Sequence, residues 1–358
     1  MRKYLRFIIL LALAVLLLWW FGRGLDWPGV RAAIAGADKL LIAGAIGIIC
    51  LSYLIRAFRW QALLKPLCPA SLSALFAATT VGFGALFLVG RAGEVLRPAF
   101  LPLRDRRVNP GAAFITIGIE RIYDLTAVVM LFAANLLWFR PPAADPGIYS
   151  RVRMAGLVML GGAALGITAL VLFERHAPQV IGWVGVYAER SPAFLRRLGR
   201  VFTNLLGQLA RALGVLVDFR ELAVTIGWTA LLWGGGMAAN WMVLRAFGLS
   251  FGPGEAIFLM GWSLVGSLVP TPGGAAGAFH AATGAGLIFL GVGHEQAAAV
   301  SIVIHLVMFA PAVIFGLYYF LRSGASFAEL RRLVSSGVPA SDERGATPEK
   351  LPTSGVQA

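Results

Sequence analysis

Charged residues are scarce in this sequence, and so are cysteines. Only 13% of its 358 residues are Asp, Glu, Lys or Arg, and 58% are hydrophobic. A typical soluble domain has about 25% charged and about 45–50% apolar residues. The two cysteines, Cys50 and Cys68, are too few for a disulfide framework or a cysteine-based metal site. These shortages exclude an ordinary soluble domain, and the long apolar runs predict an all-α, polytopic transmembrane bundle.

Acidic residues are the scarcer of the two charged types. There are 17 Asp and Glu against 31 Lys and Arg, which gives a formal net charge of +14. The basic residues lie in short loops between apolar runs and do not gather on one face, which argues against nucleic-acid binding. Cytoplasmic loops of membrane proteins are rich in Lys and Arg and lie beside anionic lipids. We therefore expect the bilayer as a partner, and no nucleic acid.

Six apolar runs are long enough to cross a bilayer, which takes about 20 residues. They are Tyr4–Gly22, Lys39–Phe58, Pro110–Phe139, Met154–Phe173, Leu222–Phe247 and Gln296–Leu321. The first run begins with basic residues like a signal peptide, but Trp19-Trp20-Phe21 stands where a small-residue cleavage site would be. Because bulky aromatic residues are typical of the membrane interface, we predict that this run is a retained span.

The positions of Lys and Arg also predict the orientation and the domain organisation. Most of them lie on the cytoplasmic side if both termini are cytoplasmic. We predict a transmembrane domain over residues 1–322 of a bacterial inner-membrane protein, followed by a cytoplasmic, disordered tail over residues 323–358. Residues 174–221 are predicted to be a basic, amphipathic cytoplasmic helix. This helix either lies in the membrane interface or packs against the protein itself.

Two further apolar segments, Ser71–Leu101 and Gly254–Gly293, are interrupted by glycine, proline or charge. The second contains Pro270-Thr271-Pro272-Gly273-Gly274, which cannot continue a helix. Each arm beside this turn reaches little more than roughly 20 Å, short of the ~30 Å hydrocarbon core. The pattern predicts two re-entrant hairpins entering from opposite faces, as in inverted-repeat transporters, or else a tight turn between packed helices. The half-helix after Gly274 would offer free N–H groups to an anion.

Charged residues in or beside these segments mark candidate sites, because one at the centre of a span costs roughly 2.5–3.5 kcal/mol. Arg91, Glu94 and Arg97 are spaced to share one helix face, with the carboxylate between two guanidiniums. Their excess positive charge could hold a phosphate, which arginine binds through two parallel hydrogen bonds. Alternatively, they mark the cytoplasmic end of a helix.

Glu120, Arg121 and Asp124 lie well inside the run that starts at Pro110. Glu120 and Asp124 share a face at i, i+4, where two carboxylates repel each other unless a cation bridges them. Arg121 lies about 100° away around the helix, so we expect an arginine of the segment Arg91–Arg97 to be the partner. This predicts a buried ionic site, with a purely structural role as the alternative.

Two histidines complete the candidates. His280 follows the Pro-Gly turn, and His305 lies inside the last run. Neither has metal-ligand residues clustered around it, so no metal site is predicted. Hydrogen bonding within the structure is the alternative to a direct role for both histidines, and also for Asn240.

Taken in order, these motifs resemble a known family, the transmembrane region of lysylphosphatidylglycerol synthases and its stand-alone flippase-like relatives. The resemblance covers roughly residues 1–322 and is carried by Gly90-Arg91-Ala92-Gly93-Glu94 with Arg97, by Glu120-Arg121 with Asp124, and by Pro270-Thr271-Pro272-Gly273-Gly274. The family commonly has a glutamate after the second turn, whereas Phe279-His280 stands there in this chain. A step that needs a carboxylate at that position is therefore not carried over.

The resemblance implies movement of an anionic phospholipid or lipid-linked amphiphile between leaflets, with no catalytic residues, cofactor or metal. Aminoacylation is not implied, since in the full-length enzymes it belongs to a C-terminal domain that is not expected after the last span here. Two alternatives stay open: a non-transporting partner of a lipid- or glycan-synthesis enzyme, and a lipid-modifying membrane enzyme. The predicted substrate-binding residues are Arg91, Glu94, Arg97, Glu120, Arg121, Asp124, Pro272, Gly273, Gly274 and His280.

Overall fold

The computed structural model describes residues 15–139, 146–189, 219–269, 271 and 273–323, together with residues 12, 203, 206, 207 and 210. In this part of the chain every regular element is a helix, which confirms the all-α prediction. Much of the first predicted span, about half of the helix predicted over residues 174–221, and the tail from residue 324 onward lie outside the described residues. Those predictions stay untested.

The described helices follow the predicted runs closely. They are α2 (Trp27–Gly36), α3 (Lys39–Leu64), α4 (Leu72–Val89), the 3₁₀ helix η1 (Gly90–Val95), α5 (Leu96–Arg104), α6 (Pro110–Trp138), α7 (Pro146–Glu189), α9 (Phe219–Ala246), α10 (Pro253–Ser267), α11 (Ala276–Phe289) and α12 (His294–Ser323). Of these, α3, α9 and α12 are long and apolar enough to cross a membrane. The total of six spans remains a prediction.

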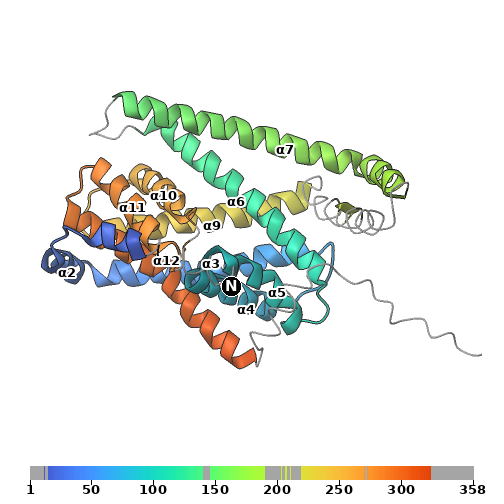
Figure 1. Ribbon diagram of the computed structural model, residues 1–358, viewed down its shortest axis with the longest axis horizontal. Coiled ribbons are helices and arrows are strands. Elements are labelled where there is room, and N and C mark those ends of the chain that lie inside the picture. The colour runs from blue at the N-terminus through green and yellow to red at the C-terminus, as the bar shows by residue number, and fades with distance from the viewer. Residues whose placement is uncertain are drawn as a thin grey trace, which may run out of the picture.

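Two elements differ from the sequence-based expectation. The run Met154–Phe173 is only the middle of α7, which has 44 residues and continues through Pro178. At about 1.5 Å per residue α7 is ~66 Å long, so it extends beyond a bilayer. It runs along one edge of the molecule, where α6 meets it (Figure 1). The short helix α2 was not predicted; the Asp26 side chain caps it by accepting the Gly29 N–H at 3.1 Å.

Both interrupted segments fold back as hairpins. The first consists of α4, η1 and α5, and its break falls at Gly90, whose φ is 69°. The second consists of α10 and α11, and its turn contains Gly273 and Gly274 with φ of 76° and 62°. These left-handed conformations are ones that glycine adopts without steric cost, which explains why the breaks occur there. The prediction of two broken-helix hairpins is therefore confirmed.

Helix α12 shows that the hairpins come from opposite ends of the bundle. Phe76, near the start of α4, packs on Tyr319 near the end of α12, with ring centroids 5.9 Å apart. Phe87, near the end of α4, packs 5.9 Å from Phe309 in the middle of α12. Helix α11 starts beside the same middle stretch, at His305, and its far end connects by a short turn to the start of α12. The two tips therefore meet halfway along α12.

The two halves of the chain repeat one order of elements: a long helix, a broken hairpin and a second long helix. Helices α3 and α9 pack antiparallel, with the Asp38 N–H on the Ala246 carbonyl at one end and Phe58 stacked on Trp228 towards the other. Helix α4 packs on α12 of the other half, and α10 packs in turn on α6. In Figure 1, α4 and α5 lie at one end of the bundle and α10 and α11 at the other. This exchange of partners is expected of an inverted repeat.

Candidate functional site

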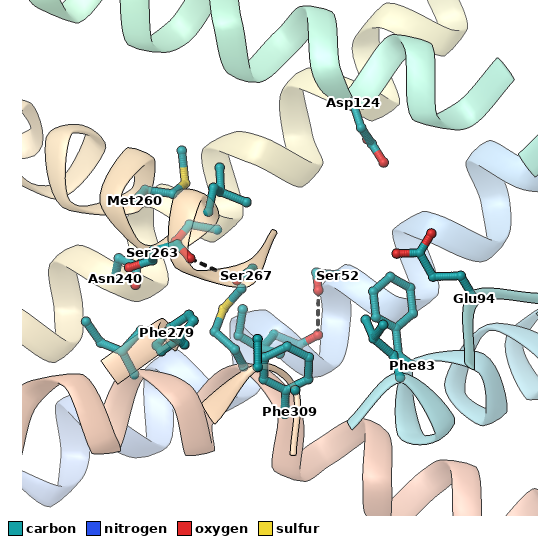
Figure 2. A pocket seen from close by; sticks show the side chains of 18 of the residues that line it. Ser52, Phe83, Glu94, Asp124, Asn240, Met260, Ser263, Ser267, Phe279 and Phe309 are labelled. Carbon is teal, nitrogen blue, oxygen red and sulfur yellow. Dashed lines mark hydrogen bonds between the residues drawn. The ribbon is translucent and has the colours of Figure 1, made fainter. Parts of the chain in front are cut away.

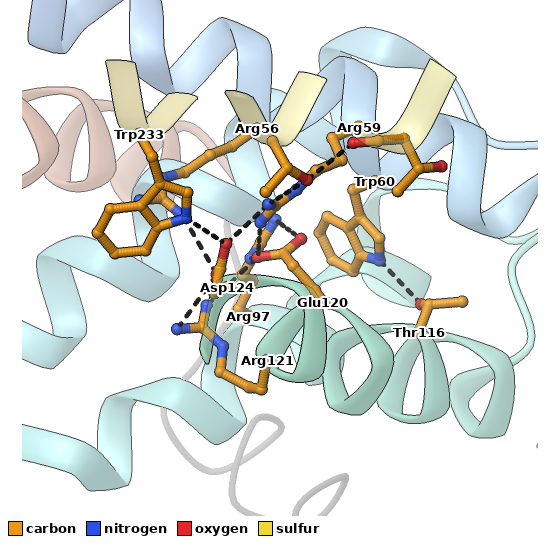
Figure 3. A network of polar contacts seen from close by, with 11 residues as sticks. Arg56, Arg59, Trp60, Arg97, Thr116, Glu120, Arg121, Asp124 and Trp233 are labelled. Carbon is orange, nitrogen blue, oxygen red and sulfur yellow. Dashed lines mark hydrogen bonds and ion pairs between the residues drawn. The ribbon is translucent and has the colours of Figure 1, made fainter. Parts of the chain in front are cut away.

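A cluster of four arginines and two carboxylates lies inside the bundle, where α3, α5, α6 and α9 approach one another (Figure 3). Helix α6 supplies Glu120 and Asp124, one turn apart on one face. The Glu120 side chain is completely buried, and that of Asp124 is 8% exposed. Two carboxylates this close and this dry need cations, because an unpaired buried charge is strongly destabilising.

Arg59 of α3 is the cation that bridges the two carboxylates. Its Nη1 donates to Asp124 Oδ1 at 2.7 Å, and its Nη2 lies 3.3 Å from Glu120 Oε1. Its side chain is completely buried, and Nη1 also reaches the Thr229 hydroxyl on α9 at 3.2 Å. Trp233, one turn further along α9, donates to the same oxygen of Asp124 at 3.2 Å. One guanidinium thus holds α3, α6 and α9 together.

Arg97 of α5 pairs with Glu120 through both terminal nitrogens, Nη1 to Oε1 and Nη2 to Oε2, the second at 3.1 Å. This is the bidentate geometry that gives arginine–carboxylate pairs their strength and direction. The Arg97 guanidinium also lies 4.4 Å above the centre of the Trp60 ring. Gly82 on α4 permits this approach, since a Cβ there would lie 2.5 Å from the Arg97 Cβ. The expected partnership between the Arg91–Arg97 segment and the acidic pair is therefore present at Arg97.

Arg121 and Arg56 complete the cluster at its open side. Arg121 Nη2 lies 3.3 Å from Glu120 and its Nη1 lies 3.8 Å from Asp124, with 43% of the side chain exposed. Arg56 Nη1 lies 3.8 Å from Asp124 and has no hydrogen-bond acceptor in the described structure. The Arg56 guanidinium also lies 4.7 Å above the centre of the Phe83 ring. Of the four arginines in the cluster, these two make the fewest hydrogen bonds to the protein.

A cavity of about 260 Å³ opens directly beside this cluster. Its charged end is formed by Arg56, Glu94, Arg121 and Asp124, and the carboxylates of Glu94 and Asp124 point into it in Figure 2. The opposite end is lined mainly by apolar side chains, including Met260, Leu264, Phe279, Ile304, Met308 and Phe309. Four small polar residues also line the cavity: Ser52, Asn240, Ser263 and Ser267. Of these, Asn240 and Ser263 lie beside Met260 and Phe279, away from Asp124 and Glu94 (Figure 2). The cavity is therefore charged at one end and mainly apolar at the other.

The predicted residues of the first hairpin are placed as follows. Arg97 belongs to the buried cluster, and Glu94 lines the cavity. Arg91 lies in η1, but its side chain is outside the description. The prediction that Arg91, Glu94 and Arg97 share one face of a single helix was wrong. The chain is a 3₁₀ helix up to Val95 and an α-helix only from Leu96. Arg97 thereby turns towards α6.

The predicted residues of the second hairpin belong to the turn between α10 and α11, which contacts α4 at Phe87. Gly274 lines the cavity, Gly273 precedes it in the turn, and Pro272 lies outside the described residues. The Gly274 N–H donates to the Phe87 carbonyl at 2.9 Å, and the N–H groups of the next two residues donate to turn carbonyls. In this conformation these three N–H groups are not available to an anion. The Gly274 N–H joins the two hairpin tips, and the other two stabilise the turn itself.

His280 lies one turn into α11 and packs against His305 of α12, with ring centroids 4.8 Å apart. Both are buried, and neither lines the cavity. Asn240 lines the cavity and donates to the Gly236 carbonyl of its own helix, which is a hydrogen bond within the structure. Among the described residues, no group of three or more His, Cys, Asp or Glu could hold a metal ion.

Arg56 and Arg59 were missed as site residues. They lie at the end of the predicted run Lys39–Phe58, where Lys and Arg were interpreted as cytoplasmic, whereas α3 continues to Leu64. The available signal was their i, i+3 spacing beside Trp60, which places Arg56 and Arg59 on one helical face. Nothing local in the sequence could connect Arg59 to its partner Asp124 on α6, which lies 65 residues further along the chain.

Comparisons with known proteins find relatives of this chain. The UPF0104 membrane protein PH1989 of Pyrococcus horikoshii is 24% identical over 325 residues, which cover 84% of this chain and 91% of that protein. The glycosyltransferase AglD of Haloferax volcanii is 23% identical over 297 residues, covering 75% of this chain but only 45% of AglD. Both organisms are archaea, so placement in a bacterial inner membrane stays a prediction. A family model for the lysylphosphatidylglycerol synthase TM region matches residues 7–316, and this multi-pass membrane protein therefore belongs to that family.

Proposed function

We propose that this protein moves an amphiphile with an anionic headgroup, a phospholipid or a lipid-linked sugar, between the two leaflets of its membrane. The observation that carries the proposal is the cavity of about 260 Å³, charged at one end and apolar at the other. An amphiphile is also polar at one end and apolar at the other. Its headgroup could therefore lie beside the charged residues and the first part of its chains beside the apolar ones.

The charged end favours a negative headgroup. The four guanidiniums of the cluster face Glu120 and Asp124, and Glu94 lines the same cavity, which leaves one positive charge in excess among these groups. Arg56 has a spare donor at the cavity edge, and Arg121 is partly exposed there. Arginine binds phosphate through planar, paired donors, so these two residues are the proposed headgroup contacts.

The hairpins support transport over static binding. Their tips meet beside the cavity through the bond from the Gly274 N–H to the Phe87 carbonyl, and they approach from opposite ends of α12. In inverted-repeat transporters, motion of one repeat against the other opens a central site to each side in turn. The tip contact is the proposed gate.

The names of the relatives support the cargo class. The family is named for a lipid synthase, and AglD is named a glycosyltransferase. We therefore propose a phosphate-bearing lipid, with or without sugars, as the cargo. A small polar side chain in the cavity wall such as Ser52 suits hydroxyl groups of a headgroup.

The test is a flux assay that resolves the leaflets, with purified protein in liposomes containing a fluorescent phosphatidylglycerol. We expect the wild type to move the probe and Arg56→Gln and the pair Glu120→Gln, Asp124→Asn to be slower. Glu221→Gln is the matched control, since Glu221 pairs with Lys65 outside the cavity. Gel filtration of each variant separates loss of function from loss of fold. Equal flux for wild type and a folded Arg56→Gln variant would refute the proposed headgroup contact, and no flux above empty liposomes would refute transport.

A second candidate is a membrane partner of a glycan-synthesis enzyme, without transport. The partial match to AglD favours it, because the region similar to this chain makes up less than half of that glycosyltransferase. Co-purification of one glycosyltransferase in stoichiometric amount, together with no flux in the liposome assay, would select this second function over the first.

A further inference from the structure

The two histidines in the middle of the bundle form a buried pair that the ionic cluster and the cavity do not use. His280 is 7% exposed and His305 is 3% exposed, and their rings pack edge-to-face with centroids 4.8 Å apart. An ionisable side chain at this depth in a membrane bundle is costly to charge, so its persistence calls for a task or a partner.

Hydrogen bonds define which nitrogen of each ring is available. His305 Nε2 lies 3.2 Å from the Gly274 carbonyl. A carbonyl can only accept, so neutral His305 donates from Nε2 and keeps the lone pair of Nδ1. His280 Nδ1 is buried and has no hydrogen-bond partner in the described structure. It is the nitrogen of the pair that can gain or lose a proton without breaking a hydrogen bond.

The surroundings contain no negative charge that would hold a permanent imidazolium. Rings from four parts of the chain contact the pair: Phe21 before α2, Phe87 on α4, Phe279 on α11 and Phe309 on α12. The titratable groups nearby come from α3: Tyr53 donates its hydroxyl to the Met308 carbonyl, and Arg56 lies one turn further along the cavity. On α10, Ser263 bonds Thr283, which is uncharged. Among the described residues, no carboxylate forms an ion pair with either histidine.

The pair is coupled directly to the contact between the hairpin tips. Gly274 accepts from His305 through its carbonyl and donates to Phe87 through its N–H, so a single residue carries both bonds. A proton added to Nδ1 of His280 would place a cation against the neighbouring donor-bearing ring of His305. This cation would lie among apolar rings without water, and its desolvation cost is relieved if the tip moves away from His305 and lets water in.

We propose that His280 and His305 form a proton-binding site that couples opening of the hairpin tips to proton movement across the membrane. The proton binds the lone pair of His280 Nδ1 and leaves from the same nitrogen, so no other reactant is needed. With both rings neutral the tips stay joined, and with one ring protonated they separate. The coupling of this site to a cargo rests on the transport function proposed above.

The first experiment measures the distance between the two hairpin tips and does not depend on transport. Spin labels at Leu88→Cys and Leu268→Cys, both exposed near the tips, are introduced with Cys50→Ser and Cys68→Ser, and their separation is measured in nanodiscs at pH 8 and pH 5. We expect a longer separation at pH 5, on the acid side of the ordinary histidine pKa of about 6.5. His280→Gln and His305→Gln should keep the pH 8 separation at both values.

His176→Gln and His294→Gln are the matched controls, because both histidines are exposed and lie away from the tips. They should respond to pH as the wild type does. A wild-type separation that is the same at both pH values, or a change that persists in His280→Gln, would overturn the proton site.

The second experiment imposes a pH gradient of two units on the liposomes that contain fluorescent phosphatidylglycerol. We expect flux to rise at least about fivefold over liposomes without a gradient, a size typical of coupling between sites, and His280→Gln to lose this increase. Flux that is the same with and without the gradient would overturn the coupling to protons but not the proposed transport function. No flux under any condition, with the pH-dependent separation intact, would remove the transport function and leave the proton site standing.

Discussion

The guanidinium of Arg59 on α3 bonds the carboxylate of Asp124 on α6 at 2.7 Å, with the Arg59 side chain completely buried. The two residues are 65 positions apart, and their pairing connects the first and the second long helix of the first half of the chain. Because Arg59 also lies 3.3 Å from Glu120, it bridges both members of the acidic pair, and Arg97 is a second partner of Glu120. The stability of the bundle interior should therefore depend on this one side chain.

Replacing Arg59 by methionine should lower the free energy of unfolding by about 3–5 kcal/mol, because two buried carboxylates lose their shared cation. The measurement is a detergent titration in mixed micelles, followed by circular dichroism. Lys65→Met is the control: the ion pair of Lys65 with Glu221 is largely exposed, and such pairs contribute about 0–1 kcal/mol. Adding Glu120→Gln and Asp124→Asn to Arg59→Met should recover part of the loss. If Arg59→Met proves as stable as Lys65→Met, the bridging role is wrong.

Asp105, in the loop between α5 and α6, makes stability depend on pH. Hydrogen bonds from Arg107 at 2.7 and 2.8 Å, and from the Ser71 N–H at 2.9 Å, hold the pKa of this carboxyl well below its usual range. A carboxyl with a lowered folded-state pKa stabilises the fold above its unfolded pKa of about 3.9, and this contribution is lost as pH falls through the folded value.

We predict that Asp105→Asn lowers the thermal midpoint of unfolding at pH 7. The difference in thermal midpoint between wild type and variant should become smaller as the pH falls below about 4. Arg107→Gln should weaken the same dependence, since it removes two of the bonds to Asp105. Thermal unfolding of detergent-solubilised protein between pH 7 and pH 3 checks both. A constant difference between Asp105→Asn and wild type over this range would show that the ionised carboxylate is not what joins the loop to α4.

Much of the architecture could be predicted because helix ends in a membrane are determined locally. Apolar runs gave the cores of α3, α6, α9 and α12, and Gly90 and the turn at Gly273 marked the breaks of the hairpins, since these positions need left-handed backbone. Helix α7 was predicted too short because its ends carry polar residues that end an apolar run without ending a helix. An apolar run indicates which part of a helix lies in lipid. The length of the helix depends on its backbone hydrogen bonds, which continue beyond the apolar part.

The candidate site could be predicted only in part, for a related reason. Glu120 and Asp124 stand out because carboxylates inside an apolar run need a partner, and Arg97 was found by the same logic. Arg59 could not be found, since a guanidinium at the end of a run looks the same whether it faces headgroups or a carboxylate. The contact of His280 with His305 depends on how α11 and α12 cross, which no local spacing encodes.

The second hairpin should be sensitive to any side chain at Gly266. A Cβ there would lie 2.6 Å from the Ala278 carbonyl oxygen and 2.8 Å from the Phe279 Cα, so α10 and α11 would have to separate. Overpacking of this kind typically costs about 1–3 kcal/mol, which is the expected loss for Gly266→Ala. Gly118→Ala on α6 is the control, because nothing lies within 4 Å of the position of its Cβ, and it should be neutral or slightly stabilising. Equal stability of the two variants, measured by detergent titration, would mean that the arms are not tightly packed.

Ala275 offers a test of strain at the hairpin tip. It has a φ of 62°, and it is the one non-glycine residue of the described chain with a positive φ. The left-handed conformation costs an L-residue roughly 1–2 kcal/mol. Ala275→Gly removes this cost but gives the unfolded chain more freedom, which opposes folding by about 0.4–1 kcal/mol. The first effect is the larger, so the variant should be more stable by up to about 1 kcal/mol.

The matched control for Ala275→Gly is Ala281→Gly, in the regular part of α11. The same chemical change in a right-handed helix removes no strain and should destabilise by about 0.5–1 kcal/mol. Unfolding of both variants in the same detergent series gives the sign of each effect. Opposite signs for the two glycines would locate the strain at the tip, whereas a loss of stability in both would mean that Ala275 is held in its left-handed conformation at no cost. Because Ala275 directly follows Gly274, whose N–H bonds Phe87, a joined tip that is freed of strain should separate less readily and lower flux in the liposome assay.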